Sequence, residues 1–131
     1  MCIGRGPHIN HRVFDLLAET AERHQIHYQP VGASGETGTD CGAIHDMRAG
    51  VATGVVSIPN RYMHSPCEII HLEDVENTAR LIAQTVARID ENTDFVPSWR
   101  AFVAGRVSRM RRIPCGTFGL DTVALLVDLT T

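Results

Sequence analysis

Apolar positions in the first part of the chain follow two different periods. Residues 11–24 carry apolar side chains three and four positions apart, separated by charged residues, and this spacing predicts an amphipathic helix. Asn10 stands where such a helix needs its N-cap. The positions expected to face the core are Val13, Phe14, Leu17 and Ala21.

Helix and strand signals then alternate as far as residue 90. Residues 26–31, 51–57 and 67–72 are rich in β-forming side chains and predict three strands. Helices are predicted over 41–49 and 73–89, the second favoured by acidic residues in its first turn. This alternation predicts an α/β fold, a mixed sheet flanked by helices. The core stripe expected on the second helix is Val75, Ala79, Ile82, Val86 and Ile89.

The character of the sequence changes after residue 90. A polar break over 90–94 precedes an arginine-rich stretch over 99–112, whose apolar residues have helical spacing. Residues 122–129 form a short apolar run of uncertain type. We therefore expect two parts: residues 1–90 as one α/β unit, and 91–131 as a C-terminal extension of unknown structure.

The composition and charge of the chain indicate a globular protein and argue against nucleic-acid and membrane partners. The chain has 131 residues, 44% apolar and 21% charged, which is typical of a globular domain. A net charge of −3 argues against a nucleic-acid partner, which requires a strongly basic face. The sequence has neither a signal-peptide core nor the ~20 apolar residues of a membrane span, so we expect a cytoplasmic protein with no membrane partner. Four scattered cysteines suit reduced thiols.

His64 is the leading candidate for chemistry. It follows the apolar run 51–57 and lies between Pro59 and Pro66, which exclude a helix and hold the segment extended or turned. It is therefore expected at the exit of a buried strand, where α/β proteins place their ligands. From the residues alone, His64 is either a metal ligand or a surface histidine.

Two other groups of residues, a set of cysteines and histidines and a glycine-rich loop, each suit either a binding site or a purely structural role. Cys41 and His45 are four apart, and His64 and Cys67 are three apart, so the four residues could form a structural Cys2His2 zinc site. Buried cysteines more often simply pack. The glycine-rich loop that ends at residues 38–40 places backbone amides beside a predicted helix start, which suits either ligand binding or helix capping.

The most specific motif is the ten-residue run 57–66, which reads Ser-Ile-Pro-Asn-Arg-Tyr-Met-His-Ser-Pro. With it, residues 1–90 resemble the tetrahedral aminopeptidases, a family that includes the glutamyl aminopeptidases and proteins often labelled endoglucanase M. The same resemblance is carried by Gly6-Pro7, the predicted helix over 11–24, Gly38-Thr39-Asp40, Glu68, Asp74 and Glu76.

The resemblance implies a cytoplasmic metallo-aminopeptidase that holds two divalent metal ions, zinc or cobalt, and forms a large homo-oligomer. It implies that His64 is a metal ligand and that Gly38, Thr39 and Asp40 lie near the peptide substrate. In that family the other ligands and the general base lie upstream of the region resembled here, so no catalytic residue is assigned. Alone, His64 is expected to hold at most one ion weakly.

We therefore expect the C-terminal part of a two-metal aminopeptidase, incomplete and inactive alone. Two alternatives stay open: a non-catalytic folding or assembly module, and a small Cys2His2 zinc domain.

Overall fold

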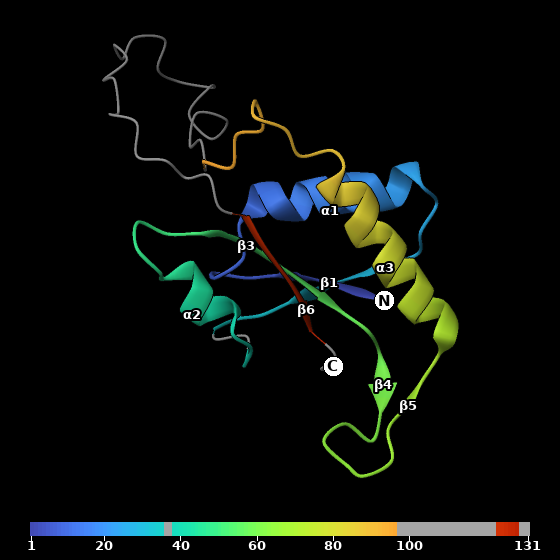
Figure 1. Cartoon of the computed structure of the whole chain (residues 1–131). Helices are drawn as coiled ribbons and strands as arrows, with labels where there is room; N and C mark the ends of the chain where they lie inside the picture. Colours follow the sequence, from blue (N-terminus) through green and yellow to red (C-terminus); the bar gives the residue numbers. More distant parts are fainter. Residues whose placement is uncertain (36–37, 97–122, 129–131) are drawn as a thin grey trace, which may run out of the picture.

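The computed structural model describes residues 1–35 and 38–96 and the backbone of residues 123–128. The chain runs β1 (Cys2–Arg5), α1 (His11–Arg23), β2 (Gln29–Gly32), α2 (Cys41–His45), β3 (Ala52–Ser57), β4 (Asn60–Arg61), β5 (Ile69–Ile70), α3 (Leu72–Val86) and β6 (Val123–Asp128). Figure 1 shows α1 and α3 packed near each other over the sheet, while α2 lies apart from them.

The main sheet has four strands in the order β2-β1-β3-β6. β1 is parallel to β2 and antiparallel to β3, and β3 is parallel to β6. The predicted mixed sheet flanked by helices is therefore confirmed. β6 comes from the range predicted as an extension, yet it pairs with β3 along six residues from Ala52↔Val123 to Ser57↔Asp128. The arginine-rich stretch over 99–112 lies outside the described residues.

α1 forms as the periodicity predicts. The Asn10 side chain accepts hydrogen bonds from the backbone N–H groups of Arg12 (2.9 Å) and Val13 (3.4 Å), which caps the helix. All four predicted core positions of α1 are buried. They pack with Ile3 of β1 and Val56 of β3, both fully buried, and β3 is buried along its whole length.

The core stripe predicted for residues 73–89 is wrong within α3, and only its last member, Ile89, packs against the core, partly buried. The residues buried on α3 are Thr78, Leu81 and Thr85, whereas Val86 is 53% exposed. The buried side of α3 packs against α1, and its Thr78 hydroxyl also lies against Met1 at the start of the chain. The Thr78 hydroxyl is satisfied by the Asp74 carbonyl at 2.7 Å, which permits its burial.

Several predicted boundaries also shift. The helix expected over 41–49 ends at His45, and the backbone then turns through Arg48 (φ 53°) and Gly50 (φ 99°). The strand expected over 67–72 is reduced to Ile69–Ile70 because α3 begins at Leu72. Neither change moves β3, which leads directly to His64.

Candidate functional site

His64 lies at the tip of a hairpin that extends beyond the sheet. β4 and β5 pair antiparallel, Asn60 with Ile70 and Arg61 with Ile69, and the connecting loop carries the histidine. Figure 1 shows this hairpin projecting away from α1 and α2. The residues from Arg61 to His71 are exposed, so the imidazole is available to a ligand outside the hairpin.

Glu68 holds the hairpin loop in shape. Its Oε1 accepts the backbone N–H of His64 at 2.8 Å, and its Oε2 accepts the Asn60 side-chain amide at 2.7 Å. Ser65 closes the turn by donating its N–H to the Tyr62 carbonyl at 3.0 Å. Glu68 therefore positions His64 through the backbone and leaves the imidazole uncommitted. Asp74, which also belongs to the resembled motif, pairs with the N-terminal ammonium.

The loop adopts a backbone conformation that these residue types rarely take. Tyr62 has φ 62° and His64 has φ 60°, both in the left-handed region. Such a conformation costs roughly 1–2 kcal/mol for a residue other than glycine. Residues in this conformation are found at ligand-binding sites and also in ordinary turns, and here Gln25 and Arg48 adopt it outside the hairpin. In the hairpin loop, the hydrogen bonds described above hold this conformation in place.

A metal ion at His64 needs ligands from elsewhere. Among the described residues, no three histidine, cysteine, aspartate or glutamate side chains are grouped closely enough to hold an ion. An exposed imidazole is a good zinc or cobalt ligand, but zinc sites use three or four protein ligands. His64 therefore fits such a centre as a single contributor.

The loop proposed to contact substrate lies at the opposite end of the sheet. β2 runs parallel to β1, whereas β3 runs antiparallel to β1. The segments that follow β2 and β3 therefore leave the sheet at opposite ends of the strands. Gly38–Asp40 follows β2, and α2 after it packs on β3. His64 follows the far end of the same strand. The described residues therefore do not bring the two predicted elements into one pocket.

The geometry of this loop shows which residue caps α2. Thr39 Oγ1 accepts the Cys41 N–H at 3.2 Å, whereas the Asp40 side chain makes no capping hydrogen bond and is exposed. Gly38 has φ 68°, a conformation suited to glycine. Asp40 is thus not explained by capping α2.

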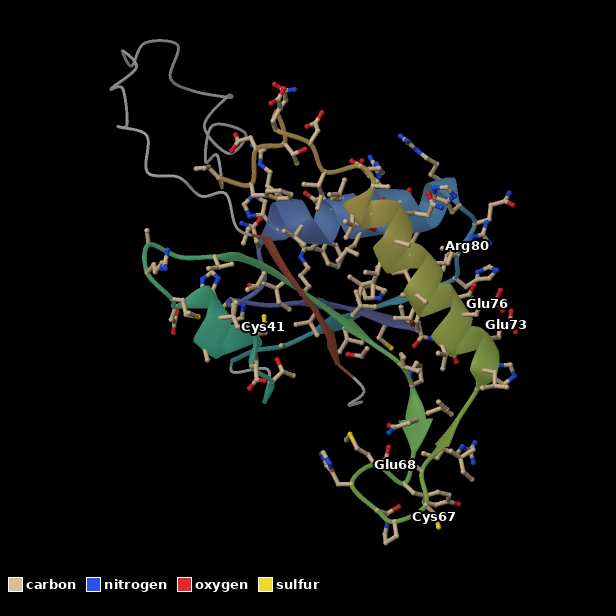
Figure 2. The ribbon with its side chains drawn as sticks, in the orientation of Figure 1. Cys41, Cys67, Glu68, Glu73, Glu76 and Arg80 are labelled. Carbon is tan, nitrogen blue, oxygen red and sulfur yellow. The ribbon has the colours of Figure 1, made fainter. Side chains whose placement is uncertain are left out.

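The four residues of the Cys2His2 alternative do not gather. Cys41 is fully buried, with its Sγ 3.4 Å from the His8 carbonyl oxygen, while Cys67 is exposed in the hairpin. Figure 2 shows these two cysteines on separate parts of the molecule. The structure therefore does not support a small zinc domain.

A cluster around Cys41 was not foreseen from the sequence. The rings of His8 and His45 meet edge to face, with centroids 5.9 Å apart, and Thr53 Oγ1 lies 3.4 Å from His45 Nδ1. Burial raises the pKa of the Cys41 thiol, and a hydrogen bond with Thr53 offsets part of that rise. His8 is 33 residues from Cys41, and no local pattern connects them.

Comparisons with known proteins agree with the motif around His64. The profile of the M42 glutamyl aminopeptidase family matches residues 1–81. The chain is 38% identical over 92 residues to a lysyl aminopeptidase of Pyrococcus furiosus, and 39% identical over 72 residues to a putative aminopeptidase of Acetivibrio thermocellus. The matched parts are 70% and 54% of this chain but 26% and 21% of those relatives.

Solved structures give the same result. A TET aminopeptidase from a marine-sediment Thaumarchaeota archaeon superposes with a TM-score of 0.63 and 32% identity, over 69% of this chain and 26% of its own. An aminopeptidase from Desulfurococcus kamchatkensis gives a TM-score of 0.56 and 34% identity, over 65% of this chain and 25% of its own. The chain thus spans about a quarter of the length of each of these structures.

Proposed function

Because the chain belongs to the M42 glutamyl aminopeptidase family, we propose that it supplies one metal ligand, His64, to a metal-dependent aminopeptidase centre. The observation that supports this most is the geometry of the hairpin: an exposed imidazole, on a strained loop, fixed by Glu68 through its backbone. The ligands that complete the centre would come from the remaining part of an M42 domain.

Two divalent ions, zinc or cobalt, are the proposed cofactors. Bound in such a centre, they would lower the pKa of a shared water and polarise the scissile carbonyl of a peptide. The contribution of this chain is narrower. The bonds from Glu68 hold the His64 backbone, so the imidazole is presented from a preorganised loop.

Peptide binding and assembly are further parts of the proposal. The substrate would be a peptide with a free N-terminus, and we retain Gly38, Thr39 and Asp40 as proposed substrate-contact residues. Since they lie at the other end of β3 from His64, they would act at a position distant from this copy's metal ligand.

Residues 1–35, 38–96 and 123–128 include no helix long and apolar enough to cross a bilayer. We propose a cytoplasmic enzyme that forms a homo-oligomer.

A second candidate function is a non-catalytic folding or assembly module. It is favoured by one observation: within the described part of the chain, His64 is not accompanied by enough ligands to hold an ion. This candidate predicts a folded protein whose presence never affects peptide hydrolysis.

A single-chain chimaera separates the two candidates. The matched region of the P. furiosus lysyl aminopeptidase is replaced by the corresponding residues of this chain, and hydrolysis of aminoacyl anilides is measured. His64→Asn is the informative variant because asparagine tolerates the left-handed conformation and so keeps the loop shape. His11→Ala, an exposed histidine on α1, is the control.

We expect the chimaera and its His11→Ala variant to hydrolyse the substrate, and His64→Asn to lower kcat/KM by more than about 100-fold. Equal activity of His64→Asn and the parent chimaera would contradict the ligand assignment. A chimaera that folds and is inactive in every form would favour the assembly module.

A further inference from the structure

β6 covers an edge of β3 to which no other segment of the described residues is paired. The sheet order is β2-β1-β3-β6, so β3 would be an edge strand if β6 were detached. The two strands pair in parallel along the whole of β3, from Ala52↔Val123 to Ser57↔Asp128, and Figure 1 shows them side by side. An unpaired edge presents a row of N–H and C=O groups that a strand of another polypeptide can bind. β6 therefore controls access to this edge.

The pairing of β1 shows which backbone groups of β3 point to β6. The Gln29 N–H donates to the Met1 carbonyl at 3.1 Å, so the backbone groups of Met1 face β2. Backbone groups of successive residues in a strand point to opposite edges, so those of Cys2 face β3. Cys2 lies opposite Ser57, and the backbone groups of Ser57 therefore face β1. By the same alternation, the N–H and C=O groups of Val56 face β6.

The same reasoning assigns the two central residues of β6. The backbone of Gly54, two residues before Val56, also faces β6, and Gly54 lies opposite Leu125. In a parallel pair, a residue that faces its partner strand bonds with the two residues on either side of its opposite number. The N–H of Leu126 therefore faces β3, and the N–H of Leu125 faces away from it.

The two edges of the sheet differ in how they are protected. At the β2 edge, Gln29 and Ala33 donate their N–H groups towards β1, so the nitrogen of Pro30 faces outwards. A proline in this position denies an incoming strand a donor. Residues 51–57 contain neither a proline nor a charge. The β3 edge therefore has no such protection of its own and depends on β6.

β6 lies outside the region that defines the family. The M42 profile matches residues 1–81, which include β3 but not β6. β3 is buried along its whole length, and buried backbone polar groups need hydrogen-bond partners. An M42 domain that contains the matched region therefore needs a partner at this edge of β3 from outside that region. In this chain β6 occupies the place of that partner.

We propose that β6 is an internal cap that closes the β3 edge and keeps this chain from joining an M42 domain supplied by a separate polypeptide. The proposal rests on the family assignment and does not depend on the metal role of His64. A competing strand binds only those molecules in which β6 has detached, so its apparent affinity is lowered by the fraction that is open. Weakening β6 therefore strengthens association without adding any contact.

Proline substitutions at two adjacent residues of β6 test the cap. Leu126→Pro removes the N–H that faces β3, whereas Leu125→Pro removes an N–H that faces away and is the matched control. Each full-length variant is co-expressed with a tagged segment comprising the rest of the P. furiosus lysyl aminopeptidase, without its matched region. The amount of this chain retained by the segment is measured. In the free variants, NMR amide exchange at Val56 reports opening of the edge, and exchange at Leu17 reports the core.

We expect Leu126→Pro to lower the protection of the Val56 amide and to raise retention, each by roughly tenfold, while Leu125→Pro stays within about threefold of the wild type. Equal retention of Leu126→Pro and the wild type would overturn the proposal, whether both are retained or neither is. An equal rise in Leu125→Pro would also overturn it.

Loss of protection at Leu17 in Leu126→Pro would count against the proposal as well, because β6 would then be an integral strand of the core and not a detachable cap. A retained complex of Leu126→Pro that binds no metal would leave the cap standing and count against the metal role of His64.

Discussion

Glu68→Ala tests how the hairpin presents its histidine. The substitution removes both acceptors that hold the loop, one for the His64 N–H at 2.8 Å and one for the Asn60 amide at 2.7 Å. Hydrogen bonds to charged groups contribute about 1.5–3 kcal/mol when shielded from water. Exposed ion pairs contribute about 0.2–1 kcal/mol. Because this loop is exposed, we take roughly 0.5–1 kcal/mol for each bond.

The two bonds together amount to about 1–2 kcal/mol, which corresponds to a factor of 5–30 in the population of the open loop. Native-state amide exchange measured by NMR reports this population at His64. We expect its protection to fall by about that factor in Glu68→Ala, while the amides of Leu17 and Val56 in the core exchange as before. Glu22→Ala, which removes an exposed carboxylate from α1, is the control. Unchanged protection of His64 in Glu68→Ala would refute the reasoning.

Three further predictions concern the core and the thiols. Leu81→Ala should lower the free energy of unfolding by about 2–5 kcal/mol in urea titrations, since Leu81 is fully buried, and Leu72→Ala by less than about 1 kcal/mol; similar losses would contradict the assigned face of α3. Cys67→Ser should abolish one rapidly reacting thiol towards a disulfide reagent, whereas Cys41→Ala should leave the rapid phase unchanged. Burial raises the folded-state pKa of the Cys41 thiol above its ordinary value of 9.0. The stability gained from burying the neutral thiol is therefore complete below pH 9 and is lost as the pH rises through the folded-state pKa. The free energy of unfolding should fall less steeply above pH 9 in Cys41→Ala than in the wild type.

The two long helices differ in how far the sequence predicts them. α1 has one apolar face, and the structure buries that face, so periodicity alone predicts both the helix and its orientation. α3 has a predicted apolar stripe and a separate side rich in threonine, and the structure buries the second, with α1 as the neighbouring helix. The choice depends on packing against α1 and Met1, which are far away in the sequence and which no local pattern of α3 contains.

The candidate site shows the same division between local and distant information. The loop that carries His64 is held by Glu68 only four residues away, and the motif around it could be recognised from the sequence. The distance between His64 and the Gly38–Asp40 loop follows from the antiparallel pairing of β3 with β1, a matter of topology. The surroundings of Cys41 depend on His8, which approaches from another part of the chain.

The most direct test of the central claim is the metal content of the chimaera that carries the hairpin within a complete M42 domain. Zinc and cobalt bound per chain are measured after dialysis for the parent chimaera, His11→Ala and His64→Asn. The account predicts equal metal content for the parent and His11→Ala, and the loss of at least one bound ion per chain in His64→Asn. Full metal content in His64→Asn would contradict it.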